Sequence, residues 1–188
     1  MNFWTCNSSA SLSFCKHYRW WLSRTWGLSH QTLLFIGLNP SLASVSRDDP
    51  TLRRIRSFAK EWHYDRLLII NLFARISTSP AFLRRCNDPV GELNDHVIEI
   101  SLLQWSCSSD WDLCLGWGVG GCWRDRDLNV LDVLQRYQHQ RMIRFPSNLG
   151  PQSLGQTKGG HPRHPLYLPR QAQLRPFSWA EASLIRHP

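Results

Sequence analysis

Two short, mainly apolar runs constrain the fold of this chain more than any other feature. They are TLLFIGL over residues 32–38 and RLLIINLF over residues 66–73. Runs of this length and composition are typical of parallel strands that are covered on both faces. Between them, apolar residues recur at helical spacing over residues 50–62, with arginines on the opposite side. This half of the chain therefore predicts a strand–helix–strand unit.

The alternation continues towards the carboxyl terminus. We predict further strands over residues 112–118 and 140–145, and further helices over residues 94–105 and 125–137. This order argues for parallel strands joined by right-handed crossovers. The fold class we expect is α/β, as a three-layer α/β/α domain with a short, mostly parallel four-stranded sheet. Ligands of such sheets bind outside the carboxyl ends of the strands.

The remaining segments are less regular. We expect residues 1–15, rich in Ser and Asn, to be disordered, and residues 16–188 to form a single domain. The aromatic segment YRWWLSRTWG (18–27) fits either an edge strand or a packing arm. After the last predicted strand, residues 146–169 form a long Gly/Pro/His stretch, which is either a functional loop or disordered.

The charge is strongly positive and is carried almost entirely by arginine. The formal net charge is +8, and the lysines are only Lys16, Lys60 and Lys158. Arginine binds phosphate through two parallel hydrogen bonds and stacks on bases, so we expect an anionic partner: nucleic acid, with DNA favoured over RNA, or a nucleotide. The alternative is that the base composition of the genome enriches arginine.

Cysteine spacing and hydropathy set the expected compartment. The 6 cysteines include no C-x-x-C pair, so we expect no metal centre, and we expect no cofactor. No segment resembles a signal peptide, and no apolar run approaches the roughly 20 residues that span a bilayer. We therefore expect a cytoplasmic monomer without membrane contact, with cysteines as small core residues.

The segment GWGVGG (116–121) fits the pattern G-x-G-x-x-G after a strand. A dinucleotide site also needs an acidic residue about 20 positions later, at the end of the next strand. That strand ends in IRFPSN, without a carboxylate, and Trp117 occupies the tight turn. A turn that lets a helix pack closely, or meet a phosphate, is the better interpretation.

Polar residues at the predicted strand ends are the candidates for chemistry. Asn39 in GLNPS either forms an Asn-Pro turn or presents its amide to a water or a ligand, and Asn71 has the same two interpretations. His161 and His164 each precede a proline, which holds their backbone extended. Either imidazole can donate to a developing anion, and the alternative is an exposed loop histidine.

Two acidic residues precede the first predicted helix. Asp48 and Asp49 form a carboxylate pair for a metal, or they cap a helix that has Pro50 in its first turn. The cap is the more economical explanation. No P-loop, nucleophile elbow or zinc-protease pattern occurs.

Longer motifs resemble a known family. YRWWLSRTWG, LLFIGLNPSLASVSRDDPTLRRIRSFAKEW, IINLFA, GWG and TKGGHPRHPLYLP look like domain of unknown function 1643 (DUF1643), over about residues 17–177. The family run Arg-Ala-Thr is replaced here by Ile76, Ser77 and Thr78, with Arg75 as the nearest substitute for its arginine. This resemblance implies no established activity.

A more distant resemblance is to the mismatch-specific branch of the uracil-DNA glycosylase superfamily. GLNPS resembles its Gly-x-Asn-Pro-Gly motif, with Ser41 in place of the last glycine, and HPRHPLY resembles its His-Pro loop. The resemblance implies that Asn39 places the attacking water and that His164 or His161 contacts the flipped base. It implies a hydrolase that cleaves N-glycosidic bonds. The alternatives are a non-catalytic nucleic-acid or nucleotide binder and a small-molecule nucleotide hydrolase.

Together these patterns give a set of candidate residues. The candidates for chemistry are Asn39, His164 and His161. The expected ligand contacts are Gly37, Pro40, Ser41, Asn71, Phe73, Trp117, Lys158, Arg163 and Tyr167. The expected phosphate contacts are Arg53 and Arg54, and we expect no metal ligand.

Overall fold

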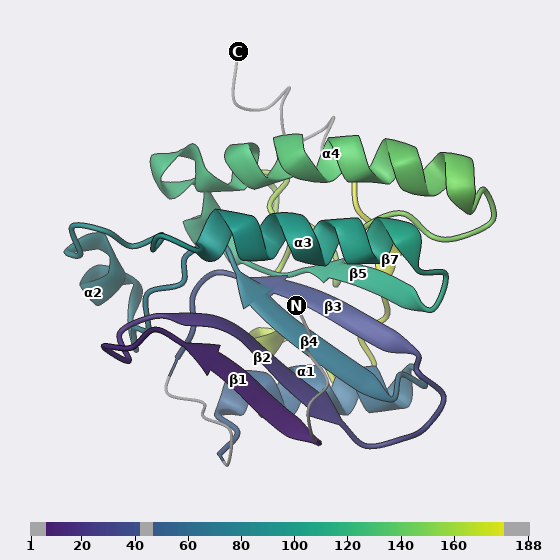
Figure 1. Cartoon of the computed structure of the whole chain (residues 1–188), viewed down its shortest axis with the longest axis horizontal. Helices are drawn as coiled ribbons and strands as arrows, with labels where there is room; N and C mark the ends of the chain where they lie inside the picture. Colours follow the sequence, from purple (N-terminus) through teal and green to yellow (C-terminus); the bar gives the residue numbers. More distant parts are fainter. Residues whose placement is uncertain (1–6, 42–46, 179–188) are drawn as a thin grey trace.

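The computed structural model describes residues 7–41 and 47–178, which form an α/β structure around one mixed sheet. Its seven strands lie in the order β1-β2-β4-β3-β5-β6-β7 (Figure 1). They are β1 (Ser8–Leu12), β2 (Arg19–Thr25), β3 (Thr32–Gly37), β4 (Arg66–Asn71), β5 (Trp111–Leu115), β6 (Gln152–Ser153) and β7 (Arg175–Pro176). The four central strands β4, β3, β5 and β6 are parallel, whereas β1, β2 and β7 pair in antiparallel fashion. The prediction of a four-stranded sheet was therefore too small, because it omitted the flanking antiparallel strands.

Helices cover both faces of this sheet. The α-helices are α1 (Pro50–Glu61), α2 (Pro80–Arg84), α3 (Asn94–Cys107) and α4 (Arg126–Arg144), and the 3-10 helices are η1 (Gly118–Asp125) and η2 (Pro165–Tyr167). Figure 1 shows α3 and α4 on one side of the sheet and α1 on the other. The three-layer arrangement follows the sequence prediction.

Two buried clusters hold the layers together, one on each face. Leu34, Ile36 and Leu68 belong to the larger cluster, together with residues of α3 and α4. Leu33 and Phe35 point the other way and pack with Leu52 and Ile55 of α1. Neighbouring residues of β3 thus enter opposite cores, which explains why its sequence is apolar without alternation.

The predicted strand over residues 140–145 is wrong, because this segment is the last turn of α4 and its cap. Its apolar residues mislead: Met142 is 59% exposed and Ile143 is 70% exposed, whereas Arg141 is 1% exposed. Arg141 donates to the backbone oxygens of Ser108 and Trp111, at 2.9 and 2.7 Å. A charged residue therefore faces the core here and the apolar residues face solvent, which is the opposite of what a hydrophobicity pattern predicts. The fourth parallel strand is instead the two-residue β6.

The amino-terminal part of the sheet also differs from expectation. β1 lies within residues 1–15, the segment expected to be disordered, and pairs with β2. Residues 18–27 contain β2, which lies between β1 and β4 and so is not an edge strand. The side chains of β2 are nearly all buried, as its aromatic composition suggests.

Within the described residues, each helix is either too short or too polar to cross a bilayer.

Candidate functional site

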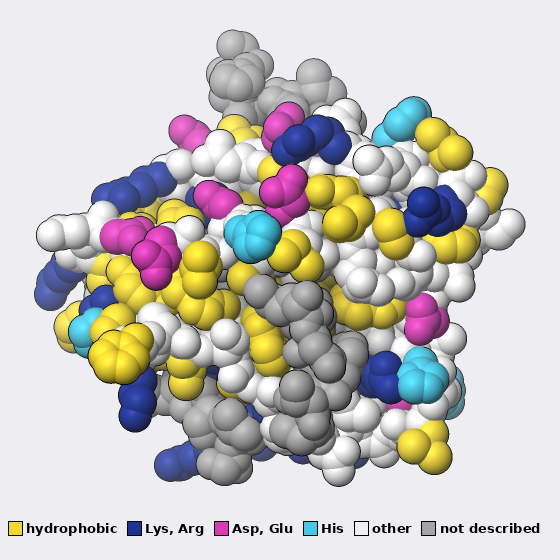
Figure 2. Space-filling view, in the orientation of Figure 1, with side chains coloured by type: hydrophobic (Ala, Val, Ile, Leu, Met, Phe, Trp, Pro, Cys, Tyr) yellow, Lys and Arg dark blue, Asp and Glu magenta, His cyan; other side chains and the backbone are white. Residues whose placement is uncertain are grey.

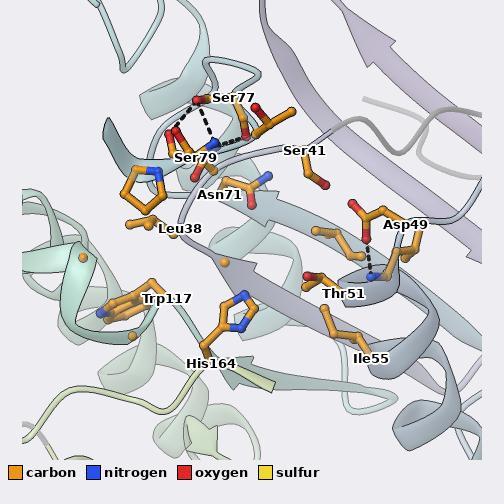
Figure 3. A pocket seen from close by; sticks show the side chains of 18 of the residues that line it. Leu38, Ser41, Asp49, Thr51, Ile55, Asn71, Ser77, Ser79, Trp117 and His164 are labelled. Atoms are coloured by element: carbon orange, nitrogen blue, oxygen red, sulfur yellow. Dashed lines mark hydrogen bonds between the residues drawn. The ribbon is translucent and has the colours of Figure 1, made fainter. Parts of the chain in front are cut away.

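A cavity of about 490 Å³ opens at the carboxyl ends of β3, β4 and β5. Its volume falls within the range of about 300–1,000 Å³ that is usual for small-molecule sites. Figure 3 shows side chains from separate segments around one hollow: Asn71 at the end of β4, Trp117 after β5, Asp49 before α1, and His164. The expected position of a ligand site, outside the carboxyl ends of parallel strands, thus coincides with a real cavity.

Several residues predicted from the sequence meet at this cavity. The lining includes Gly37, Asn39, Ser41, Asn71, Trp117, His164 and Tyr167. They come from the turn after β3, the ends of β4 and β5, and the His-Pro segment before η2. Chain topology brings them together although Gly37 and Tyr167 lie far apart in the sequence.

Asn71 has the least ordinary environment of these residues. It is 4% exposed, and its Nδ2 is buried without a hydrogen-bond partner among the described residues. No hydrogen bond to its Oδ1 is found within the described residues either. An unpaired buried amide donor costs about 1–3 kcal/mol. The cavity therefore holds one donor and one acceptor, side by side, that a ligand can pair.

Glycine on the neighbouring strand makes room for this amide. Gly37 lies opposite Asn71 in the β3–β4 register. A Cβ atom at position 37 would lie 2.9 Å from Asn71 Oδ1 and 3.2 Å from Phe35 Cε1. Real Cβ atoms almost never lie as close as 2.9 Å to another heavy atom, so a side chain at position 37 would displace the Asn71 amide. Gly37 contributes to the site because it has no side chain that would occupy the space of the Asn71 amide.

The backbone at the end of β4 is fixed from behind. Asn94, at the start of α3, donates through Nδ2 to the oxygens of Asn71 and Leu72, at 3.1 and 2.8 Å. Arg126 donates through Nε to the oxygen of Leu72 at 2.7 Å. These bonds satisfy carbonyls that would otherwise be unpaired where the strand ends. They also hold the Asn71 amide in place.

His164 reaches the cavity from the opposite side (Figure 3). Its backbone is extended, with φ −69° and ψ 134°, as the following Pro165 requires. Its Nδ1 accepts a hydrogen bond from the Leu166 N–H at 3.3 Å. In a neutral ring the proton is then assigned to Nε2, which is left as a donor. Burial lowers the pKa of His164, and the charge of Asp49 opposes this shift only in part.

The segment that carries His164 is ordered by its own hydrogen bonds. Gln156 and Pro162 form a bridge, and the Thr157 N–H donates to the His161 oxygen at 2.9 Å. The Gly118 N–H donates to the oxygen of Pro162 at 2.9 Å, which joins this segment to the turn after β5. Of the two interpretations for residues 146–169, the ordered loop fits, and it places His164 on a stiff support.

Asn39 uses part of its amide for structure. Its Nδ2 donates to the oxygens of Pro40 and Ser77, both at 3.0 Å. The Ser77 N–H donates in turn to the Pro40 oxygen at 2.9 Å. The Asn-Pro turn is thereby tied to the loop after β4. Only Oδ1 of the Asn39 side chain is left for a ligand or a water.

The two aspartates before α1 have separate tasks. Asp49 caps the helix by accepting from the Leu52 N–H at 2.7 Å, and it lines the cavity. Asp48 pairs with Arg24 at 2.9 Å and with Arg56 at 3.2 Å. The helix-cap prediction is confirmed for Asp49. Over the described residues, no group of three or more His, Cys, Asp or Glu side chains is placed to hold a metal ion.

The glycines of GWGVGG serve close packing. A Cβ at Gly116 would lie 2.5 Å from Phe35 Cζ, and a Cβ at Gly120 would lie 2.8 Å from Leu38 Cδ2. Because Gly116 and Gly120 have no Cβ atom, this segment can lie close to Phe35 and Leu38. Trp117, which is 2% exposed, then lies on the cavity wall. The packing interpretation of this segment is confirmed.

Other candidate residues lie away from the cavity. Phe73 is buried in the larger core, and Pro40 is buried beside Asn39. His161 faces Asp127 of α4, with Nδ1 3.6 Å from Oδ2. Arg54 binds the Leu168 oxygen at 2.6 Å, and with Arg53 it lines a second hollow. Two further candidates, Lys158 and Arg163, are exposed and do not line the cavity.

The sequence reasoning did not identify several lining residues. Arg19 of β2 and Arg84 of α2 line the cavity, as do Thr51 and Thr78. Arg19 is 4% exposed in a strand with aromatic neighbours. A charged residue directly before two tryptophans was the available signal. Its position depends on the antiparallel pairing of β2 with β4, which no local pattern reveals. Arg75, considered as a substitute for the family arginine, stacks on Tyr18 instead, 5.4 Å from the ring centroid.

His164 should make stability depend on pH in mildly acidic solution. Its folded-state pKa lies below the ordinary value of 6.5, so the unfolded chain binds more protons in this range. The free energy of unfolding should therefore fall as the pH drops from 6.5 towards the folded-state pKa, with no contribution from His164 above 6.5. Urea unfolding of the wild type and His164→Gln at several pH values measures this, and the variant should show a flatter profile.

The matched control is His139→Gln, at an exposed position on α4. It should retain the wild-type profile. Equal flattening in both variants, or none in His164→Gln, would contradict a lowered pKa at His164.

Comparison with known proteins gives one family and no individual relative. The family described as "Protein of unknown function (DUF1643)" matches residues 19–166. No curated protein and no solved structure matches the chain.

Proposed function

The chain belongs to the DUF1643 family, and from its cavity we propose that it binds a nucleobase and hydrolyses the N-glycosidic bond of that base. The observation that carries this proposal is the Asn71 amide, which is buried at the cavity wall and whose Nδ2 has no hydrogen-bond partner in the described part of the chain. Every nucleobase displays a donor next to an acceptor on an edge, and an asparagine amide pairs with such an edge through two hydrogen bonds.

Apolar walls complete a base-shaped environment. Phe35, Leu38 and Trp117 line the cavity beside Asn71. Bases held by enzymes that act on them are usually hydrogen-bonded along one edge and enclosed by aromatic or apolar side chains. The combination of a two-atom polar edge and apolar walls supports a base better than it supports a sugar or a peptide.

His164 supports a role in catalysis. When the glycosidic bond breaks, its electron pair moves onto the base, which becomes anionic unless it is protonated. The Nε2–H of a neutral His164 can donate a hydrogen bond to that developing charge. Because burial lowers the pKa of His164, the ring is neutral at pH 7 and keeps this single donor.

Asp49 supports the other half of the reaction. Its carboxylate lines the cavity, and its hydrogen bond to the Leu52 N–H occupies Oδ1. The second oxygen can accept a proton from a water that attacks the sugar carbon. Water then supplies the hydroxyl to the sugar and a proton for the released base, so the reaction is balanced without another reactant.

The experiment is a base-release assay. The protein is incubated with nucleosides, nucleotides and oligonucleotides that contain uracil or mismatched bases, and free base is separated by chromatography. Release by the wild type, lowered about 100-fold in His164→Gln, supports the hydrolase. His139→Gln is the matched control and should retain full activity.

A non-catalytic binder is the second candidate, and the structure of the Asn39 turn favours it. The Asn39 Nδ2 already donates to two backbone oxygens, so this amide has less capacity to orient a water. Binding of a nucleoside without base release would select this candidate. If no nucleoside, nucleotide or oligonucleotide binds, both candidates are rejected.

A further inference from the structure

The charged side chains that line the cavity favour one class of ligand. Two guanidinium groups, Arg19 and Arg84, and one carboxylate, Asp49, belong to the described lining. With His164 neutral at pH 7, the charged lining residues leave one positive charge in excess. A neutral base or nucleoside would not change this net charge of the lining, whereas an anionic ligand would balance it.

Arg19 is the more constrained of the two arginines. It is 4% exposed, and burial lowers its pKa to about 10, so it still carries its charge at neutral pH. Asp49 is the acidic group that acts on it most strongly. Keeping a guanidinium charged at a largely buried position is costly, and a phosphate next to it would offset that cost.

Hydroxyl groups add further donors. Ser41, Thr51 and Thr78 line the cavity, and among the described residues none of these three hydroxyls has a hydrogen-bond partner. Figure 3 shows Ser41 and Thr51 on the same side of the hollow as Asp49. Serine and threonine hydroxyls combined with arginine are common ligands of phosphate oxygens.

On one face of the molecule outside the cavity, positive charge is dispersed (Figure 2). Arg53 and Arg54 line a separate hollow with Pro50, Ser57 and Leu166. On the face shown in Figure 2, Lys and Arg side chains are scattered among acidic, hydrophobic and histidine side chains and form no continuous stripe. A polymer of phosphates needs an extended basic track, whereas a single phosphate needs only the arginines within the cavity.

On the basis of the proposed nucleobase site, we propose that the physiological ligand is a nucleoside monophosphate, whose phosphate binds to Arg19 and Arg84 while its base pairs with Asn71. The cavity is then one mononucleotide site that combines a neutral amide with two cationic side chains. This assigns Arg19 and Arg84 to phosphate recognition, in place of the surface arginines of α1.

The test is equilibrium binding by calorimetry in about 0.15 M salt, where screening weakens non-specific contacts. The probes are the four ribonucleosides, their 5′-monophosphates, inorganic phosphate, and a single-stranded oligonucleotide. At least one monophosphate should bind about tenfold or more tightly than its nucleoside, and inorganic phosphate should compete with it.

Arg84→Gln should reduce the preference of the protein for the monophosphate over the nucleoside, whereas the neighbouring Arg85→Gln should not. Arg84 and Arg85 are both exposed at the end of α2, but only Arg84 lines the cavity. Arg19→Met should abolish the preference if the variant folds, and Arg84→Gln tests the proposal independently of that.

The outcomes separate the two proposals. If a nucleoside binds as tightly as its monophosphate, the phosphate site is wrong and the base site stands. If the oligonucleotide binds and no monophosphate does, the mononucleotide proposal is overturned. If no probe binds, the nucleobase site itself fails, and the phosphate site with it.

Discussion

Replacing Asn71 by leucine is expected to stabilise the protein by about 1 kcal/mol while weakening binding of its nucleoside or nucleotide ligand by about tenfold or more. The two effects have the same origin. The Asn71 Nδ2 is buried and has no hydrogen-bond partner within residues 7–41 and 47–178, so the folded protein carries a desolvation cost that a ligand would relieve. Leucine has the same branched shape and number of side-chain heavy atoms, and it removes that cost together with the donor and acceptor that pair with the base.

Urea unfolding and calorimetric titration of the same preparations measure the two quantities. Asn129→Leu, at an exposed position on α4, is the matched control and should change neither by more than about 0.5 kcal/mol. A loss of stability in Asn71→Leu would show that the amide is satisfied within the protein. Unchanged affinity would show that the amide does not contact the ligand.

Arg141→Leu should lower the free energy of unfolding by about 3–5 kcal/mol, a large fraction of the total stability of a domain of this size. Arg141 is 1% exposed and donates to the backbone oxygens of Trp105, Ser108 and Trp111. It therefore caps the end of α3 and fixes the start of β5 at the same time. Leucine leaves these carbonyls buried without donors, and it also removes the stacking of the guanidinium on Trp105, 4.8 Å from the ring centroid.

Urea unfolding followed by tryptophan fluorescence and by far-UV circular dichroism measures this loss. Arg144→Leu is the matched control, because Arg144 lies on the same helix and is exposed. Its effect should remain within about 0.5 kcal/mol. Similar values for the two variants would contradict the proposed capping role of Arg141.

The central part of the fold was predictable because its signals are local. β3 and β4 are apolar on both faces, and Asp49 with Pro50 marks the start of α1. The segment over residues 140–145 was not predictable in this way. Arg141 is buried because it donates hydrogen bonds to backbone oxygens, whereas Met142 and Ile143 are exposed. Hydrophobic patterns fail where hydrogen bonds to backbone decide which side chain faces inward.

The flanking strands had weaker signals. β1 has the sequence SSASL, and its strand character comes from backbone pairing with β2. β6 and β7 have two residues each and are defined only by their neighbours in the sheet. Such strands depend on tertiary context rather than on their own composition.

The candidate site was predictable as far as topology determines it. Asn39 follows β3, Asn71 ends the neighbouring parallel strand β4, and His164 lies in a loop near the same edge, so the order of elements was enough to group them. Arg19 comes from an antiparallel strand and Arg84 from the short helix α2, and neither position follows from the parallel pattern. Chemistry supplied by irregular or antiparallel segments requires coordinates.

The pairing of Gly37 with Asn71 links correct assembly of the sheet to the ability to bind. If β3 were shifted by one residue against β4, Ile36 or Leu38 would take the place of Gly37 and fill the space that the amide needs. A misaligned molecule would still be compact, yet it would have no base site. The fraction of a refolded sample that binds ligand therefore measures the fraction of molecules in which β3 and β4 are correctly aligned.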